Sequence, residues 1–436
     1  MDRLSADRPG GAGGPLPEGG HALIIGAGIV GVATAIWLSR AGRRVTLIDR
    51  AGPGEGASGG NGGVLASASI VPVTVPGLLA KAPRMLLDPD QPLFLRWSYL
   101  PRLAPWLWRY LAEARADRTR ATARALFPII ADSLAQHQAL AAGTAAAARV
   151  RPCDYSFLYR DRAHFDGDAF GWSLRREAGF RWDELEGAAL READPAWGPQ
   201  IGFAARLGGH GRIDDPGAYL RELFAHAEGL GVRLVRAEAQ AAVIEAGRVS
   251  GLRIATPGGQ GAEVIACDAL VLCAGAWSGV LARQLGLRAP LEAERGYHLD
   301  LFGASILPKA AAMVAAGKFV ATPMTDRLRL AGIVEFGGLT AGPSRPPFAL
   351  LLKNIRAAMP GLTWDHAEEW MGHRPAPADS VPVIGALPGA AGAYAGFGHH
   401  HVGLTGGPKT GRILADLICG RAPNLDLAPY APSRFH

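Results

Sequence analysis

The segment from His21 to Asp49 constrains the fold more than any other part of the sequence. It reads as a strand (ALII), a glycine turn, a helix (ATAIWLSRAG) and a second strand (RRVTLID). Gly26, Gly28 and Gly31 give the turn the pattern GxGxxG. A strand, this turn and a helix in that order predict the opening of a doubly wound parallel sheet that binds a dinucleotide.

Each glycine of the turn has a physical task. Gly26 permits the tight turn, Gly28 lets the backbone approach a pyrophosphate, and Gly31 allows the helix to pack on the strand. The free N–H groups at the start of the helix are donors for the anion. We therefore expect the whole turn to contact the cofactor, namely Gly26, Ala27, Gly28, Ile29, Val30 and Gly31.

An acidic residue ends the second predicted strand. Asp49 follows the turn by about 20 residues, where a carboxylate binds the ribose hydroxyls of a dinucleotide. Arg50 has two open interpretations, a contact with the adenine or phosphate region and a solvated side chain. Together these features predict dinucleotide binding, but they do not separate FAD from NAD.

Composition narrows the class of protein. The 436 residues are 49% hydrophobic and 19% charged, which indicates a globular chain long enough for two domains. The net charge is +6, but the basic residues are interspersed with acidic ones and form no basic runs. Nucleic acid is therefore not an expected partner. The four cysteines are too far apart for a zinc site or a disulfide framework, which fits a reducing, cytoplasmic compartment.

Nucleotide-binding patterns recur along the chain. Helix-then-strand and strand-turn-helix patterns occur again near the middle and at the C-terminal end. We expect an α/β fold in which a dinucleotide-binding, Rossmann-like, doubly wound domain is built from residues 20–77, 208–293 and 372–436. A substrate domain with a mostly antiparallel sheet and helices would take residues 78–207 and 294–371. Residues 1–19 read as a flexible tail and not as a signal peptide.

An aromatic segment runs from Leu93 to Tyr110. Its tryptophans and tyrosines stand among arginines, a composition typical of interfacial membrane anchors. The favoured alternative is a helical part of the substrate domain with the aromatic side chains packed inward. A peripheral contact on the inner face of a membrane, or a homo-oligomer, remains open.

Four further motifs occur in the order found in one family of flavoproteins. They are GASGGNGG (56–63), VLCAGAWS (271–278), RPAPADSVPVIG (374–385) and GFGHHHVGLTGGPKTG (396–411). With the N-terminal turn, they make the chain resemble the D-amino-acid oxidase superfamily of FAD-dependent oxidoreductases, most closely its D-amino-acid dehydrogenase branch. The resemblance covers nearly everything from His21 to Phe435.

The resemblance implies FAD as the cofactor and extends its binding site. The glycine loop would lie along the pyrophosphate and ribityl chain, and a second turn would contact FAD. A strand near the middle of the chain would touch adenine through backbone. The C-terminal glycine turn would aim N–H groups at the N1/C2 side of the isoalloxazine, where charge accumulates on reduction. The residues concerned are Ser58, Asn61, Gly62, Gly63, Gln240, Ala274, Gly275, Trp277, Gly398, Val402, Gly403, Leu404 and Thr405.

The substrate site is expected around Arg374. The resemblance implies that the arginine of the RPxxxD pattern binds the substrate carboxylate. The planar guanidinium suits this role, because it can form two parallel hydrogen bonds to a carboxylate. Tyr297 either hydrogen-bonds that carboxylate or serves as a core aromatic residue. His399 or His401 is expected to border the flavin or the substrate. We expect no metal at the three adjacent histidines, since neighbours on an extended chain point to opposite sides.

The expected reaction is oxidative deamination of a D-amino acid. Hydride passes from the α-carbon to flavin N5, and water hydrolyses the imino acid to a 2-oxo acid and ammonia. No motif for a general base is evident. A quinone, another carrier or oxygen would accept the electrons. The alternatives are oxidation of a secondary amine, such as a D-hydroxyproline-like, sarcosine-like, glycine-like or opine substrate, and a flavin subunit of a larger complex. An NAD-dependent dehydrogenase is disfavoured by the C-terminal motif.

Overall fold

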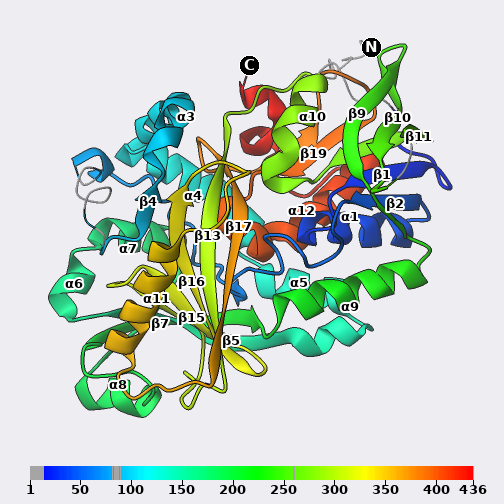
Figure 1. The fold of residues 1–436 in the computed structure, drawn as a ribbon. Helices are drawn as coiled ribbons and strands as arrows, with labels where there is room; N and C mark the ends of the chain where they lie inside the picture. The colour runs from blue at the N-terminus through cyan, green and yellow to red at the C-terminus, as the bar shows by residue number, and fades with distance from the viewer. Residues whose placement is uncertain (1–13, 81, 83–87, 89, 259–260, 436) are drawn as a thin grey trace, which may run out of the picture.

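The computed structural model describes residues 14–80, 82, 88, 90–258 and 261–435. Figure 1 shows two parts side by side, one around the short strands β1, β2 and β19 and the other around the long strands β13, β16 and β17. The chain passes between these parts several times, as the strands of each sheet come from distant segments.

The first part is a six-stranded sheet in the order β18-β19-β12-β1-β2-β8, parallel except for β18. Its strands are β1 (His21–Ile25), β2 (Arg44–Asp49), β8 (Arg233–Arg236), β12 (Ala269–Leu272), β18 (Val383–Ala386) and β19 (Ala393–Phe397). A small sheet lies next to it, formed by β9 (Glu238–Glu245), β10 (Arg248–Ala255) and β11 (Ala262–Ala266).

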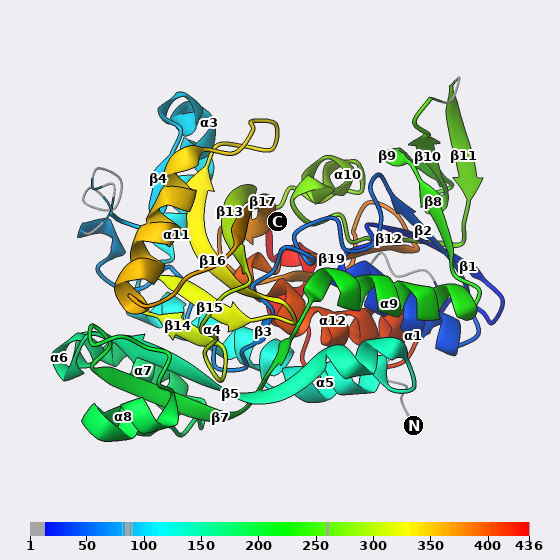
Figure 2. The same ribbon diagram turned by 60° about the horizontal axis from the view of Figure 1, so that its bottom comes forward.

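Burial on both faces explains the apolar runs of this sheet. Along β1, Ala22 and Ile24 pack into a core with the helices, whereas Leu23 and Ile25 pack into a second core with the small sheet. The helices of the first core include α1 (Ile29–Arg40), α4 (Ala116–Ile130), α5 (Ser133–Ala141), α9 (Pro216–Gly229) and α12 (Gly403–Ile418). Figure 2 shows α1, α9 and α12 beneath the sheet and α10 (Ser278–Gln284) above it. The doubly wound arrangement predicted from the sequence is confirmed.

The second part is a ten-stranded, mostly antiparallel sheet, as expected. Its main path is β17 (His366–Pro377), β13 (Leu291–Phe302), β16 (Arg327–Phe336), β15 (Phe319–Pro323), β14 (Ala312–Val314), β5 (Val150–Tyr159), β7 (Phe203–Ile213) and β3 (Val64–Leu65), with β4 (Leu93–Leu95) on β16 and β6 (Asp183–Glu186) on β7. The helices of this part are α3 (Leu100–Ala112), α6 (Arg162–Asp166), α7 (Ala169–Glu177), α8 (Gly187–Ala193) and α11 (Arg345–Ala358).

Glycines let α1 and α12 lie in direct contact. A Cβ atom at Gly407 would come within 2.6 Å of Ile29, and one at Gly411 within 2.7 Å of the backbone nitrogen of Thr34. The C-terminal motif at residues 396–411 thus also contains glycines that serve helix packing. Both helices begin at the cavity described below, which is lined by Gly28 and Gly403.

The structure differs from the expected boundaries. Three predicted domain limits, at 207/208, 293/294 and 371/372, fall inside β7, β13 and β17. Residues 1–13 of the predicted flexible tail lie outside the described residues. Residues 14–19 do not behave as a tail, because Leu16 is buried and its N–H donates to the carbonyl oxygen of Ile418.

The aromatic segment divides between two environments. Trp106 and Tyr110 of α3 are buried and stacked, as the favoured interpretation predicted. Trp97 and Trp108 are instead 57% and 79% exposed. Among the described residues, no helix is both long and apolar enough to span a membrane.

Candidate active site

A cavity of about 1870 Å³ lies between the two parts. It is lined by the N-terminal glycine turn and the end of β2 on one side, and by residues of β13, β16 and β17 on the other. Its volume exceeds the roughly 300–1,000 Å³ of an ordinary ligand pocket. The space therefore suits a dinucleotide together with a second, smaller molecule.

The cavity brings together most of the residues predicted for the site. Those that line it are Gly26, Gly28, Ile29, Val30, Asp49, Arg50, Ser58, Asn61, Gly62, Gln240, Ala274, Gly275, Trp277, Tyr297, Arg374, His399, His401, Val402, Gly403, Leu404 and Thr405. Four predicted cofactor residues, Ala27, Gly31, Gly63 and Gly398, are not among its lining residues. A Cβ atom at Gly31 or Gly398 would meet the neighbouring turn or Pro377, which gives these two glycines packing roles.

The nucleotide turn is shaped to admit a ligand close to its backbone. Gly26 has a φ of +108°, and a Cβ atom there would lie 2.4 Å from the carbonyl oxygen of Cys273. The hydroxyl of Ser58 accepts a hydrogen bond from the N–H of Ile29 at 3.1 Å. The glycine loop and the start of α1 are thus joined where the pyrophosphate is expected.

Asp49 holds the turn in place. Its carboxylate accepts hydrogen bonds from the N–H groups of Ala27, Ala51 and Gly52 at 2.8 to 2.9 Å. A carboxylate has about four acceptor positions, so one remains for a ribose hydroxyl. Arg50 stacks on Trp277, with its guanidinium carbon 4.1 Å from the ring centroid, and the residue is exposed to solvent, so both interpretations stay open. Gln240 lines the cavity, and its carbonyl accepts a hydrogen bond from Gln284.

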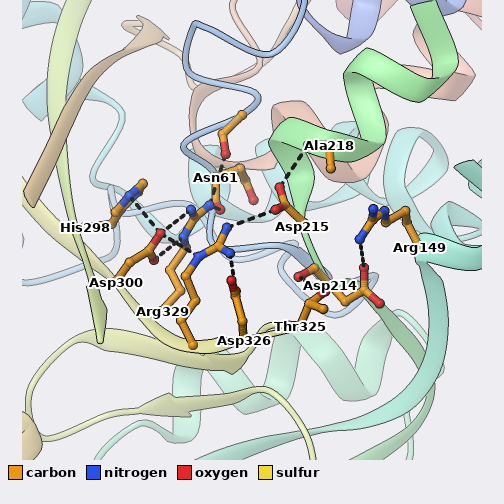
Figure 3. A network of polar contacts seen from close by, with 12 residues as sticks. Asn61, Arg149, Asp214, Asp215, Ala218, His298, Asp300, Thr325, Asp326 and Arg329 are labelled. Atoms are coloured by element: carbon orange, nitrogen blue, oxygen red, sulfur yellow. Dashed lines mark hydrogen bonds and ion pairs between the residues drawn. The ribbon is translucent and has the colours of Figure 1, made fainter. Parts of the chain in front are cut away.

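A buried polar network fixes the glycine loop to the ten-stranded sheet (Figure 3). Arg329 donates to the carbonyl oxygens of Gly59 and Asn61, at 3.0 and 2.9 Å, and to both carboxylate oxygens of Asp300. His298 makes a 2.8 Å hydrogen bond to the carbonyl oxygen of Gly60. These side chains therefore set the position of the loop from across the interface of the two parts.

The residues present fit FAD. The lining runs from the end of β2 and the start of β9, where an adenosine would lie, to the N-terminus of α12. Two helix N-termini border it, and their first N–H groups have no partner within the helix. FAD would be held by the turn at Gly26–Val30, by Asp49 and by the loop at Ser58–Gly62, with its redox-active ring toward Gly403–Thr405.

Arg374 is the cation at the far end of the cavity. It lies directly opposite Glu294 in the register of β13 and β17, and a Cβ atom at Gly296 would lie 2.7 Å from its guanidinium carbon. Gly296 thus leaves the space that the guanidinium occupies. Burial lowers the pKa of Arg374, and Glu294 opposes that shift. Within the described part of the chain, the guanidinium has no hydrogen-bond or ion-pair partner.

Tyr297 lines the cavity, and two roles were expected for it, binding of the substrate carboxylate and a core aromatic residue. Its side chain belongs to the core under α11, where the ring packs against Phe348. Its hydroxyl donates to Glu335 at 2.6 Å and accepts from the N–H of Ser344 at 3.0 Å. Because alternate residues of a strand face opposite sides, Tyr297 points away from the face that carries Glu294 and Gly296. The alternative of a core aromatic residue is the one that fits.

The three adjacent histidines have three different environments. His399 makes a 2.9 Å hydrogen bond to Thr410, and burial lowers its pKa to about 4. His400 is held by Glu294 at 2.8 Å and has a φ of +50°, which is strained for a residue with a side chain. His401 meets His400 through their two Nδ1 atoms at 2.6 Å. His399 is therefore turned into α12, whereas His401 stays at the cavity.

Sequence reasoning missed Glu294, Gly296, His400 and Arg329. A signal for Glu294 and Gly296 was present in the strand ERGYHLDL, where the polar residues Glu294, His298 and Asp300 stand at alternate positions. Polar residues at every second position of a strand indicate one polar face.

Known proteins share this chain's sequence and fold. The family described as FAD dependent oxidoreductase matches residues 21–417. A D-amino-acid oxidase from Bradyrhizobium diazoefficiens is 39% identical over 96% of this chain and 100% of its own length. A D-amino acid dehydrogenase from Paramagnetospirillum magneticum is 33% identical over 95% and 98%. The crystal structure of glycine oxidase from Bacillus cereus superposes with a TM-score of 0.70 at 19% identity, over 93% of this chain and 99% of that one.

Proposed function

Because the chain belongs to the family of FAD dependent oxidoreductases, we propose that it catalyses the oxidative deamination of a D-amino acid. Two full-length relatives at 39% and 33% identity carry the names D-amino-acid oxidase and D-amino acid dehydrogenase. These names support the D configuration of the substrate. The alternative of a secondary amine has no specific observation in its favour.

The observation that carries the proposal is the unpartnered guanidinium of Arg374. Arg374 is partly withdrawn from water, and a cation in such a place is costly to leave without a carboxylate unless a ligand supplies one. Arg374 lines the cavity that also contains the nucleotide turn and the N-terminus of α12. An α-carboxylate on its fork would fix an amino acid by two parallel hydrogen bonds.

The residues of the chain divide the work of the reaction. Arg374 binds and orients the carboxylate, and the apolar side chains of Val334 and Phe336 on β16 exclude water from this end of the cavity. The N–H groups of Gly403, Leu404 and Thr405 stabilise negative charge that develops next to α12. Bound FAD supplies the two-electron acceptor for hydride from the α-carbon. Water then hydrolyses the imino acid to a 2-oxo acid and ammonia.

Replacement of Arg374 tests the proposal. We expect Arg374→Lys to lower kcat/KM for a D-amino acid by about 100-fold, chiefly through KM, because lysine cannot form the bidentate pair. The ultraviolet-visible spectrum of the bound flavin should be retained. Arg102→Lys, on the outer side of α3, is the matched control. Equal kcat/KM in the wild type and Arg374→Lys would contradict the role of Arg374.

The electron acceptor is a separate part of the proposal. The curated relatives carry both oxidase and dehydrogenase names, and Trp97 and Trp108 are exposed close to Arg102 and Arg109. We place a membrane contact with a quinone at these tryptophans, a pattern typical of interfacial segments. Trp97→Ser with Trp108→Ser should reduce co-sedimentation with anionic vesicles but leave flavin reduction unchanged. Faster reoxidation of the reduced flavin by oxygen than by a quinone in vesicles would contradict the quinone as acceptor. Loss of a dimer in the double variant would instead identify the surface at Trp97 and Trp108 as an oligomer interface.

A further inference from the structure

Glu294, His400 and His401 form a hydrogen-bonded chain that ends at the cavity. One oxygen of Glu294 lies 2.8 Å from Nε2 of His400, and Nδ1 of His400 lies 2.6 Å from Nδ1 of His401. Glu294 and His400 are 3% and 6% exposed. His401 lines the cavity, and its Nε2 has no hydrogen-bond partner among the described residues.

The two distances restrict where protons can lie. An ionised Glu294 only accepts, so Nε2 of His400 carries a proton. The two Nδ1 atoms share one further proton, because two lone pairs or two N–H groups would repel each other at 2.6 Å. If His401 holds that proton, its Nε2 is a free base. If His400 holds it, His400 is a cation next to Glu294 and Nε2 of His401 carries a proton.

Nearby charges disfavour a positive charge on His401. Burial, the charge of His400 and the charge of Arg374 all lower the pKa of His401. Burial by itself would raise the pKa of Glu294, but His400 and Arg374 bring it below the usual carboxyl value. Tyr110 of α3 and Glu292 of β13 also face Glu294, and burial raises the pKa of each.

We propose that Glu294, His400 and His401 form a proton relay that accepts the ammonium proton of the bound amino acid. An N–H bond of the ammonium group breaks and Nε2–H of His401 forms. At the same time Nδ1–H of His401 breaks and Nδ1–H of His400 forms. The substrate becomes a neutral amine, and the positive charge lies on His400, 2.8 Å from the Glu294 carboxylate.

The relay meets a requirement of the proposed function, on which it rests. An amino acid is an ammonium ion at neutral pH, and its α-carbon cannot release hydride until the nitrogen has a lone pair. A carboxylate held by Arg374 leaves the ammonium group in the same region as His401, since the charge of Arg374 acts on that imidazole. The strained backbone of His400 is consistent with a residue held for function.

The pH dependence of anaerobic flavin reduction tests the relay. For the wild type with saturating D-alanine, the rate constant should rise with pH and level off near neutrality. For His401→Gln and His400→Gln, it should be about 100-fold lower at neutral pH, in the usual range for loss of a general base. The rate constant of these variants should then continue to rise with pH and approach the wild-type value near pH 10, about where the amino group of D-alanine loses its proton to solvent. A structural defect would not be rescued by high pH.

Two further variants complete the kinetic test. Glu294→Gln keeps an acceptor oxygen but removes the charge, so it should move the acid limb of the profile to lower pH by about one unit or more. His366→Gln, at an exposed position of β17, is the matched control and should keep the wild-type profile. Flavin content and circular dichroism establish that each variant is folded.

A readout independent of turnover tests the hydrogen bond itself. The proton between the two Nδ1 atoms should give a far-downfield proton NMR resonance in the holoprotein, absent from His400→Gln and His401→Gln and present in His366→Gln. Absence of the resonance in the wild type would overturn the relay. The relay would also be overturned if His400→Gln and His401→Gln kept the wild-type rate constant of flavin reduction at neutral pH. The same holds if their rate constants were lower than the wild-type value by one constant factor at every pH. A wild-type protein whose flavin no D-amino acid reduces would instead overturn the proposed function, and the relay with it.

Discussion

Single buried ionisable residues set the chemistry of this cavity. Arg374 and Glu294 lie opposite each other on two strands, and Arg329 reaches from the substrate sheet to the glycine loop. Only Arg374 could be found from the sequence, because it stands within a motif. Glu294 and Arg329 acquire their roles through strand register and through contacts between residues more than 100 positions apart, which local sequence patterns do not encode.

Buried neutral histidines predict a loss of stability in mild acid. Burial lowers the pKa of His137 and His399 to about 4, from an unfolded value near 6.5. Between these values the unfolded chain binds protons that the folded chain does not, so the folded state loses stability as pH falls below about 6.5. Each histidine accounts for roughly 3 kcal/mol at full effect. Denaturant unfolding of the holoprotein should show this decline, and a constant free energy of unfolding from about pH 7 to pH 5 would contradict it.

At the scale of elements, α1 and α12 bring two helix N-termini to one cavity. The sequence predicted both helices, since each follows a strand and a glycine turn. It did not predict that glycines of α12 make room for α1, because nothing in the pattern of one helix identifies its neighbour. The limits of the domains were also missed, since β7, β13 and β17 continue through the predicted boundaries.

Substitution of a glycine in α12 tests this packing. A Cβ atom at Gly411 would lie 2.6 to 2.8 Å from atoms of Ala33 and Thr34, so we expect Gly411→Ala to separate the helices. It should lower Tm by several degrees and weaken FAD binding by about tenfold or more. Gly229→Ala, at the end of α9 with nothing within 4 Å of its Cβ position, should instead be neutral or slightly stabilising. Calorimetry and FAD titration distinguish the two, and equal behaviour would contradict the packing argument.

At the scale of the whole molecule, the two parts share one large cavity. Residues of the six-stranded and the ten-stranded sheets line it together. The overall α/β class and the sharing of each sheet among distant segments were predictable from the order of the motifs. The juxtaposition of the glycine loop with Arg329 and His298 was not, since it depends on how the two sheets meet (Figure 3).

Removal of FAD should therefore destabilise the entire protein. A ligand at 1,000 times its Kd stabilises the folded state by about 4 kcal/mol, so the apoprotein should unfold roughly 5 °C or more below the holoprotein. Adenosine diphosphate lacks the isoalloxazine and should restore only part of the difference. Differential scanning calorimetry of the three samples measures this effect, and identical Tm values would contradict a cofactor held between the two parts.

The central claim is that the Arg374 end of the cavity presents a D-amino acid to FAD. The most direct measurement is anaerobic addition of D-alanine and L-alanine, in separate samples, to the FAD-loaded protein, with the visible flavin absorbance recorded. D-alanine should bleach the flavin and yield one 2-oxo acid per FAD, whereas L-alanine should leave the flavin oxidised. Failure of every D-amino acid tried to bleach the flavin, or faster bleaching by the L-enantiomers, would contradict the central claim.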